Sequence, residues 1–371
     1  MRNFLVAICL WMVINEVVMF GDASVEDQAQ LKLLAVLFRH GDRTPDPSIG
    51  EYFRTSLSPK NNWFPAGPGN LLNEGKLREY NLGRALKSRY DEFLGDIYYP
   101  AILKARSTDY DRTKMSLQLV LNGLFPPAPI QQWKKGVDWQ PIPTEYFRAE
   151  EDWVLRPDLC PKTMAAKNTY VNSTEYRERL SELEDLSKCL EKATGKEYKT
   201  IVDMALLYIY LSQEAASGRK LPEWTKGIFP NGRLLDAATF YFDIQTRNDE
   251  LRRLSGGMLL RKITDDFKSY RNGTLEQGRK LYAYSAHDVN IAALLGALGI
   301  WKPHMPQYSS AVIMELLEYN DEYFIKVVRY LGIPPKFIEV RIPQCDKLCP
   351  MDKFLFLMKN VIATDDDLEC V

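Results

Sequence analysis

A surplus of charge of either sign is the first thing that this chain lacks. Its 48 lysines and arginines balance 49 aspartates and glutamates, so the formal net charge is only −1. Such a chain has no general attraction to nucleic acid or to an anionic membrane. It also lacks internal repeats, low-complexity tracts and the glycine motifs of nucleotide-binding loops. These absences exclude repeat proteins and nucleotide-dependent enzymes of those types, and 46% of hydrophobic residues is ordinary for a globular protein.

Long hydrophobic runs are absent beyond residue 23, so we expect no membrane-spanning helix there. Within residues 1–23, the apolar stretch 4–20 is interrupted by only two polar residues and is followed by small residues at 21–23. This pattern predicts a secretory signal peptide that is removed on export. An uncleaved anchor is the alternative, although the interruption leaves a run too short to span a bilayer comfortably. In a secreted, extracellular protein, the sequons at Asn172 and Asn272 are expected to accept glycans.

Cysteine is scarce, and its count is odd in the exported chain. Removal of Cys9 with the signal leaves five of the six cysteines, so one thiol stays free or pairs with another molecule. Cys345 and Cys349 lie close enough along the chain to close a small loop. A zinc site needs four clustered ligands, and no histidine lies near this pair. We therefore predict no metal.

Histidine is scarcer still, with three residues in 371, and one of them lies between two arginines. The segment RHGDRTP places His40 between Arg39 and Arg43, directly after the mostly apolar run 31–38. Such a run, ended by Gly and Pro, predicts a buried β-strand that stops in a loop. Ligands of α/β proteins bind at the carboxyl ends of strands, where arginine matches phosphate oxygens and a neutral imidazole is a competent nucleophile. A basic surface turn is the alternative for this segment alone.

A second histidine repeats this arrangement. The β-prone run 280–286 ends in the pair His287-Asp288, and the apolar stretch 289–299 predicts a helix immediately afterwards. The start of such a helix points backbone N–H groups at an anion. A buried, hydrogen-bonded histidine followed by an N-capping aspartate is the alternative, but it is weaker when both histidine segments occur in one chain. We therefore expect His40 and His287 to converge on one site.

The segment RSTDYDRT supplies a third candidate guanidinium. It lies between two helical patterns, at 77–90 and 114–121, and Arg106 is the expected third cation of the site. Its charged neighbours are interpreted as local capping and ion-pair residues, namely Asp109, Asp111 and Arg112. A capping loop with solvated charges explains this segment equally well when it is taken alone.

Together, these three segments resemble the histidine acid phosphatase family, the branch that includes the prostatic and lysosomal acid phosphatases. RHGDRTP matches the family signature RHGxRxP, RSTDYDRT matches its RSTDxDRT segment, and YSAHD contains its catalytic HD pair. The order is the same, and the likeness runs from about residue 31 to residue 370. RHGxRxP with a distal HD pair is a specific combination, whereas either half alone is weak. Within the family, the chain is most similar to the insect venom acid phosphatases.

The resemblance implies a fold and a disulfide pattern. The implied fold is α/β, with a mixed central sheet flanked by helices, as in phosphoglycerate mutase, and with an inserted smaller helical cap. Family resemblance pairs Cys160 with Cys370, which leaves Cys189 free. It also implies phosphate monoester substrates, no cofactor, and a monomer or homodimer. The near-zero net charge and the lack of a basic amphipathic helix predict no nucleic acid or membrane partner. A venom enzyme of this kind is expected to be an allergen.

The patterns along the chain agree with one α/β body and one helical insert. We expect the body to comprise residues 24–150 and 240–371, and the insert residues 151–239, where helical patterns replace strand signals. Helices are expected at 174–190, 198–216 and 239–266, and a hairpin of strands at 311–318 and 323–330 with its turn at Asn320-Asp321. The Pro-, Gly- and aromatic-rich segment 45–70 is too long for a simple connection and is expected to form a lid.

These residues suit the hydrolysis of a phosphate monoester, which requires clustered cations, an uncharged nucleophile and an acid at the leaving oxygen. We assign His40 as the nucleophile that forms a phosphohistidine and Asp288 as the proton donor, the roles that the family motif carries there. The expected phosphate ligands are Arg39, Arg43, Arg106 and His287. The guanidiniums should lower the pKa of His40 and keep its ring neutral in mild acid. Loss of the Asp288 proton should lower the rate as the pH rises through neutrality.

Other functions are compatible with parts of this pattern. A phytase shares both histidine segments but needs additional Lys and Arg around a polyphosphorylated substrate, and a cofactor-dependent mutase takes its acid from a glutamate. A secreted binding protein could keep the fold without catalysis, yet every expected catalytic residue is present. A lipid phosphatase lacks the basic amphipathic helix that would hold it on a membrane. Trp63, Tyr110 and Trp224 are candidate substrate contacts, although packing explains each of them more simply.

Overall fold

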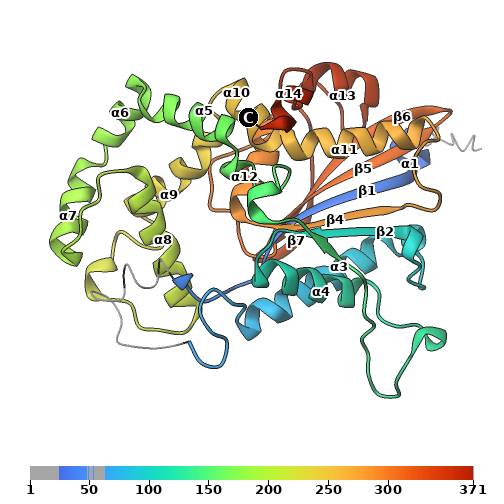
Figure 1. Cartoon of the computed structure of the whole chain (residues 1–371), viewed down its shortest axis with the longest axis horizontal. Helices are drawn as coiled ribbons and strands as arrows, with labels where there is room; N and C mark the ends of the chain where they lie inside the picture. The colour runs from blue at the N-terminus through green and yellow to red at the C-terminus, as the bar shows by residue number, and fades with distance from the viewer. Residues whose placement is uncertain (1–24, 48, 50–52, 54–62, 371) are drawn as a thin grey trace, which may run out of the picture.

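A mixed β-sheet forms the centre of the molecule (Figure 1). The computed structural model describes residues 25–47, 49, 53 and 63–370, so the predicted signal segment 1–23 lies outside the described residues. Eight strands of the described part form one sheet in the order β3-β2-β4-β1-β5-β6-β7, and β8 pairs with β6. The strands are β1 (Gln30–Arg39), β2 (Leu103–Ser107), β3 (Glu145–Tyr146), β4 (Leu281–Ala286), β5 (Ala311–Tyr319), β6 (Glu322–Gly332), β7 (Pro335–Val340) and β8 (Cys349–Pro350). The predicted mixed sheet flanked by helices is confirmed.

The pairing of the strands brings several strand ends to one edge of the sheet. β1 runs parallel to β4, with Arg39 opposite Ala286, and β2, which ends at Ser107, also runs parallel to β4. β5 is antiparallel to β1, so its first residue, Ala311, lies at this same edge. The residues after β1, β2 and β4 and the residues before β5 therefore surround one place, the carboxyl edge at which α/β sheets bind ligands.

Helices cover both faces of the sheet, which explains why β1 is apolar along most of its length. Leu33 and Leu37 of β1 point into one core, with α11, α12 and α13, whereas Leu34 and Phe38 point into the other, with α3 and α4. Figure 1 shows α3 and α4 on one side of the sheet and α11 and α13 on the other. The bounds are α3 (Asn73–Leu94), α4 (Asp111–Leu124), α11 (Gly256–Arg271), α12 (Asp288–Ala297) and α13 (Met351–Met358).

β5 and β6 form the predicted hairpin. Asn320 and Asp321 have φ angles of 50° and 62°, the left-handed backbone that a type I′ turn requires at both central positions. Asn and Asp adopt this region more readily than most other non-glycine residues. The turn fixes the register, because the pairing continues without interruption from Tyr319 opposite Glu322 to Ala311 opposite Tyr330.

A second group of helices packs around its own apolar core, beside the sheet (Figure 1). It contains α5 (Pro161–Val171), α6 (Thr174–Ser181), α7 (Glu184–Thr194), α8 (Ile201–Ala216), α9 (Arg233–Asp243) and α10 (Asp249–Leu254). The core also includes Leu251 and Leu254 of α10 and Met258 of α11. Packing is therefore continuous past residue 239, and the boundaries 151–239 of the helical insert stay a prediction.

Two of the predicted helices are divided in the structure. The pattern 239–266 predicted one helix, which is wrong: α9 ends at Asp243, and α10 and α11 follow as separate helices. The side chain of Asn248 accepts a hydrogen bond of 2.8 Å from Leu251 N–H and thereby caps the start of α10. The pattern 174–190 is likewise divided into α6 and α7. Apolar spacing continues across both breaks because the pieces on either side contribute to the same core.

The cysteines are bonded as the sequence and the family resemblance predicted. The bonded pairs are Cys160–Cys370 and Cys345–Cys349, and Cys189 is exposed and unbonded. None of the helices in the part that the structure describes combines the length and the apolar character needed to cross a bilayer.

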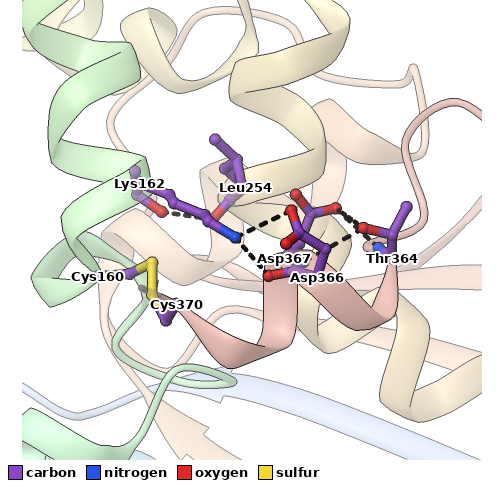
Figure 2. The surroundings of a disulfide bond; sticks show 8 residues. Cys160, Lys162, Leu254, Thr364, Asp366, Asp367 and Cys370 are labelled. Carbon is purple, nitrogen blue, oxygen red and sulfur yellow. Dashed lines mark hydrogen bonds and ion pairs between the residues drawn. A yellow bond between two sulfur atoms is a disulfide. The ribbon is translucent and has the colours of Figure 1, made fainter.

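The C-terminal helix α14 (Asp365–Glu369) is fastened to α5 by the first of these disulfides. Figure 2 shows Cys160, which precedes α5, bonded to Cys370, which follows α14. Beside this bond, Lys162 of α5 forms an ion pair of 2.9 Å with Asp366 of α14. The end of the chain is thus attached to the helical group by both a covalent bond and a charged contact.

Candidate active site

The residue that follows each of three strands carries a polar side chain into one place. His40 follows β1, Thr108 follows β2 and His287 follows β4. Backbone hydrogen bonds fix two of these positions: His40 N–H donates to the Ala286 carbonyl at 3.0 Å, and Thr108 N–H donates to the Ser285 carbonyl at 3.1 Å. The ring centroids of His40 and His287 are 5.4 Å apart. The structure therefore brings the two histidines together.

His40 is buried and is oriented by its own loop. Its Nδ1 lies 2.9 Å from the carbonyl oxygen of Gly41. A carbonyl can only accept, so Nδ1 carries the proton and Nε2 keeps its lone pair. Burial lowers the pKa of His40 well below its usual value. Three guanidiniums lower this pKa further, in the order Arg112, Arg39 and Arg43. The expected direction of the shift holds, but burial is a larger cause than the arginines.

His287 is held by two threonines of the segment RSTDYDRT. Its Nε2 lies 3.0 Å from Thr108 Oγ1, which donates to Thr113 Oγ1 at 2.9 Å. The Thr113 hydroxyl itself donates to the Thr108 carbonyl. Thr108 Oγ1 therefore accepts from Nε2–H of His287, and Nδ1 keeps its lone pair. Burial, followed by Arg112 and Arg156, lowers the pKa of His287 well below its usual value.

Arg39, the last residue of β1, connects this strand to Asp288. Its Nη2 is 2.8 Å from Asp288 Oδ2, and its Nη1 donates to the Pro306 carbonyl. The Tyr308 ring lies against the guanidinium, with 3.9 Å between Cζ and the ring centroid. The other oxygen of Asp288 accepts from Val289 N–H at 2.9 Å, in the first turn of α12. The carboxyl group of Asp288 thus lies between a guanidinium and a helix N-terminus.

Arg43 and Arg112 share one carboxylate. Arg43 Nη2 lies 2.7 Å from Asp46 Oδ2, and Arg112 Nη1 lies 3.0 Å from Asp46 Oδ1. The pKa of Arg112 is lowered to about 10. Burial is the largest cause of this shift and Arg43 adds to it, whereas Asp46 opposes it. The Nε atoms of Arg39, Arg43 and Arg112 are buried and have no hydrogen-bond partner among the described residues. These N–H groups are donors of the kind that bind phosphate oxygens.

Arg106 has other partners, although its Nε is likewise buried without a hydrogen-bond partner among the described residues. It lies within β2, its Nη2 is 2.5 Å from Asp152 Oδ1, and its guanidinium lies over the Phe147 ring at 4.2 Å. It is not among the arginines that lower the pKa of either histidine of the site. The structure therefore favours Arg112 over Arg106 as the third guanidinium. The sequence held one signal for this, because Arg112 stands in the first turn of a helix, where the helix dipole disfavours a cation that lacks an anionic partner.

The described ends of the segment 45–70 lie beside the site. Thr44 Oγ1 donates to the Gly67 carbonyl at 2.7 Å, and Arg43 forms an isolated antiparallel bridge with Leu71. The segment therefore begins and ends next to Arg43. Residues 48, 50–52 and 54–62 lie outside the described residues, and the lid stays a prediction.

Several further residues contribute to the site although the sequence analysis gave them another role or none. They are Thr108, Arg112, Arg156 and Tyr308. Arg156 donates to Tyr110 Oη at 2.6 Å, and the Tyr110 ring packs edge-on against His287 with 5.1 Å between centroids. Of the other two candidate aromatics, Trp63 lies beneath Arg219 and lines a pocket with Thr44, whereas Trp224 packs on the helical core. Across the residues that the structure describes, no group of three or more His, Cys, Asp or Glu could hold a metal ion.

Comparisons with known proteins agree with this fold and show the family of the chain. A family model described as the histidine phosphatase superfamily, branch 2, matches residues 30–330. The chain is 42% identical to venom acid phosphatase Acph-1 of Apis mellifera, over 92% of this chain and 88% of the relative. It is 32% identical to prostatic acid phosphatase of Bos taurus, with the same two coverages of 92% and 88%.

Solved structures show the same fold. The phytase of Klebsiella sp ASR1 matches with a TM-score of 0.68 over 92% of this chain and 99% of that one, at 16% identity. The phytase of Hafnia alvei in complex with tartrate matches with a TM-score of 0.68 at 18% identity, over 91% of this chain and 98% of that one. At these identities the likeness concerns the fold alone. On the evidence of the family model and of the relatives, this chain belongs to branch 2 of the histidine phosphatase superfamily.

Proposed function

We propose that this protein is an acid phosphatase that hydrolyses phosphate monoesters through a phosphohistidine formed on His40. The observation that carries the proposal is the distance of 5.4 Å between the ring centroids of His40 and His287, among guanidiniums that lower the pKa of both rings. Transfer of a phosphoryl group needs clustered cations and a neutral nucleophile in one place. The acid phosphatases among the relatives support the same reaction class.

In the first half-reaction, Nε2 of His40 attacks the phosphorus atom. A P–N bond forms while the P–O bond to the leaving group breaks, and Asp288 gives its proton to the leaving oxygen. Arg39, Arg43 and Arg112 stabilise the charge on the nonbridging oxygens, each contact contributing roughly 1.5–3 kcal/mol. In the second half-reaction, water attacks the same phosphorus atom and the P–N bond breaks. The proton of the attacking water returns to Asp288, and inorganic phosphate leaves.

His287 is proposed to bind the phosphate as an imidazolium. Its Nε2–H is directed to Thr108, so only a second proton, on Nδ1, makes it a donor to the substrate. A phosphate dianion next to the ring raises the pKa of His287 and thereby favours this second proton. Acid pH favours the protonated form of His287, while the lowered pKa of His40 keeps the nucleophile neutral. The rate should therefore fall as the pH rises through neutrality, and a flat profile from acid to alkaline pH would contradict this assignment.

A rapid-quench experiment tests the proposed intermediate. The wild-type enzyme, mixed with a ³²P-labelled monoester, should yield a phosphoenzyme that is labile in acid and stable in base. His40→Ala should abolish both the adduct and turnover. His304→Gln is the matched control, because His304 stacks on Trp301 outside the site. An acid-stable adduct, or normal turnover by His40→Ala, would remove His40 from the role of nucleophile.

Secretion and glycosylation form part of the same proposal. The venom relative supports export, and the two sequon residues, Asn172 and Asn272, are exposed at the ends of α5 and α11. The chain produced in insect cells should appear in the medium, begin near residue 24 and lose mass on treatment with a glycosidase. Retention of residues 1–23 on a cell-bound protein would contradict the prediction of a cleaved signal.

The substrate class can be tested against a phytase, because solved phytases share the fold. We expect simple aryl and tyrosyl phosphates to have higher kcat/KM values than phytate. The reverse order would reassign the enzyme to inositol polyphosphates without changing the reaction at phosphorus.

A further inference from the structure

Glu79 is an acidic residue that lies in the interior of the protein, which is unusual for a glutamate. It lies on α3 with an exposed fraction of 0%, and its Oε1 accepts a hydrogen bond of 2.6 Å from Ser309 Oγ, which is equally buried. Its Oε2 has no hydrogen-bond partner among the described residues. Burial, the largest cause, raises the pKa of Glu79 well above its usual value, so the group stays protonated and neutral in acid. A buried carboxyl with one partner costs stability, which calls for a reason for its presence.

Its partner, Ser309, has a strained backbone. The φ angle of Ser309 is +56°, in the left-handed region that non-glycine residues seldom adopt. Both neighbours of Ser309 contact Arg39. The Tyr308 ring lies 3.9 Å from Arg39 Cζ and 5.9 Å from the His40 ring centroid, and the Ser310 carbonyl accepts from Arg39 N–H at 2.9 Å. Strain of this kind persists where surrounding contacts enforce it, and it is concentrated at functional sites.

The turn 308–310 is also held in place by contacts on two further sides. It immediately precedes β5, whose antiparallel pairing with β1 brings it to the edge of the sheet that holds His40. On the other side, Gly332 at the end of β6 lies so close that a Cβ atom there would be 1.8 Å from the Tyr308 carbonyl oxygen. The Glu79 hydrogen bond holds the central residue of the turn, which has no other hydrogen bond from its side chain among the described residues.

We propose that Glu79 is a positioning residue whose hydrogen bond to Ser309 holds the turn 308–310 in its left-handed conformation, so that Tyr308 fixes the plane of the Arg39 guanidinium beside His40. The proposal rests on the phosphatase function proposed above. Tyr308 is suited to this task because its ring face attracts the guanidinium without using an N–H donor that the phosphate needs. Glu79 itself has no contact with either histidine, and it acts through the turn.

The test compares variants that remove the hydrogen bond between Ser309 and Glu79 with a variant that keeps an acceptor at position 79. Glu79→Leu has no acceptor and Ser309→Ala has no donor, so both should lower kcat by about ten- to a hundredfold, the cost of a small misplacement near the reacting atoms. KM should change less, because the charge on Arg39 matters most in the transition state. Glu79→Gln retains an oxygen acceptor and should keep kcat close to that of the wild type. Glu92→Leu, an exposed glutamate on the same helix, is the matched control.

Ser309→Gly separates the backbone effect from general damage. Glycine adopts a φ of +56° at no steric cost, so Ser309→Gly should be more active than Ser309→Ala although both lack the hydroxyl. Wild-type kcat in Ser309→Ala and Glu79→Leu would overturn the proposal, as would equal impairment of Glu79→Gln and Glu79→Leu. If Ser309→Ala or Glu79→Leu does not fold, the Glu79→Gln and Ser309→Gly enzymes test the proposal instead. Both should keep at least a tenth of wild-type kcat. Greater losses in both would overturn the proposal.

Failure of this proposal is distinguishable from failure of the proposed function. A wild-type protein that releases no phosphate from any monoester would refute the phosphatase function. The turn could then still be judged by the affinity of the folded variants for orthovanadate. Weaker binding by Glu79→Leu than by Glu79→Gln would support the role of Glu79 in placing Arg39, and equal binding would refute it.

Discussion

At the scale of single residues, Arg112 and Arg106 have different partners. Arg112 shares Asp46 with Arg43 and lowers the pKa of both site histidines, whereas Arg106 pairs with the buried Asp152. Arg112→Ala should lower kcat/KM by about a hundred- to a thousandfold, because the transition state loses a charged donor. Arg106→Ala is the matched control, and it should keep its inhibition by vanadate but melt at a lower temperature, because Asp152 is left buried without its partner. Equal loss of vanadate affinity in both variants would contradict this division of tasks.

Asp288 allows a second prediction at this scale. If it protonates the leaving oxygen, Asp288→Asn should slow alkyl phosphates by about a hundred- to ten-thousandfold. The same variant should slow 4-nitrophenyl phosphate far less, because that leaving group departs without a proton. Steady-state kinetics over a series of leaving groups measures the difference. An equal loss across the series would mean that Asp288 serves to hold Arg39, with which it forms an ion pair of 2.8 Å.

His40 and His287 were predictable as single residues because each stands at the end of an apolar run that could be identified as a strand. Tyr308 and Glu79 were not predictable in this way. Tyr308 matters because it contacts Arg39, and Glu79 because it contacts Ser309, and in each pair the two residues lie far apart along the chain. No local pattern records such a contact.

At the scale of elements, the start of α3 packs against the loop after β1, which contains His40 and Asp42. A Cβ atom on Gly75 would lie 2.2 Å from the Asp42 carbonyl oxygen, which already accepts from Leu72 N–H at 2.9 Å. Gly75→Ala must therefore move α3 or the loop that carries His40. We expect kcat to fall by about tenfold or more, and the free energy of unfolding to fall by about 1–3 kcal/mol.

Lys76→Ala is the control for this prediction, because Lys76 lies on the same turn and points its ammonium to Asn73. Circular dichroism melting and turnover measured on both variants would separate the effects. A Gly75→Ala enzyme with wild-type kcat would show that the helix end and the loop after β1 move independently.

Elements could be predicted where the local pattern and the fold agree. The β5–β6 hairpin was predictable because Asn320 and Asp321 carry a turn signal of their own. The division of the pattern 239–266 was not predicted, because apolar spacing continues through the break and the cap is a single side chain, Asn248. Hydrophobic periodicity shows which face of an element is buried, but it does not show where one helix gives way to the next.

At the scale of the whole molecule, two buried neutral histidines should make the folded protein sensitive to acid. The pKa values of His40 and His287 in the folded protein lie well below 6.5, and burial is the largest cause of this shift. In the unfolded chain both imidazoles titrate at about 6.5. Between the folded pKa values and 6.5 the unfolded state binds more protons. The free energy of unfolding therefore falls as the pH falls through this window, by up to about 1.4 kcal/mol per pH unit for each histidine.

Urea unfolding at pH 7.5 and at pH 5.0 tests this expectation in the phosphate-free enzyme. The double variant His40→Asn/His287→Asn should lose less stability between the two pH values than the wild type. The carboxylates are common to both proteins, so the difference isolates the two imidazoles. Identical losses would contradict the neutral, buried state of these rings.

The disulfide Cys160–Cys370 joins residues that are 210 positions apart and ties the C-terminal helix to α5 (Figure 2). Loop-closure entropy predicts that Cys370→Ser lowers the free energy of unfolding by roughly 5 kcal/mol, whereas Cys349→Ser, which opens a loop of separation 4, should cost roughly 2 kcal/mol. Thermal melting of both variants in oxidising buffer measures the contrast. A larger loss in Cys349→Ser would mean that the effect is local packing and not chain entropy.

The sequence alone determined the strands that end in RHG and HD, the near-zero net charge, the hairpin turn and the family resemblance, because each depends on neighbours along the chain. Only the tertiary structure decided that Arg112 shares Asp46 with Arg43 whereas Arg106 pairs with Asp152, and that Glu79 bonds to Ser309 in the turn next to Arg39. The physical reason is that these contacts depend on the direction of each side chain. Where a side chain points depends on strand register and on the packing of helices from distant parts of the chain, and neither is recorded in a short segment of sequence.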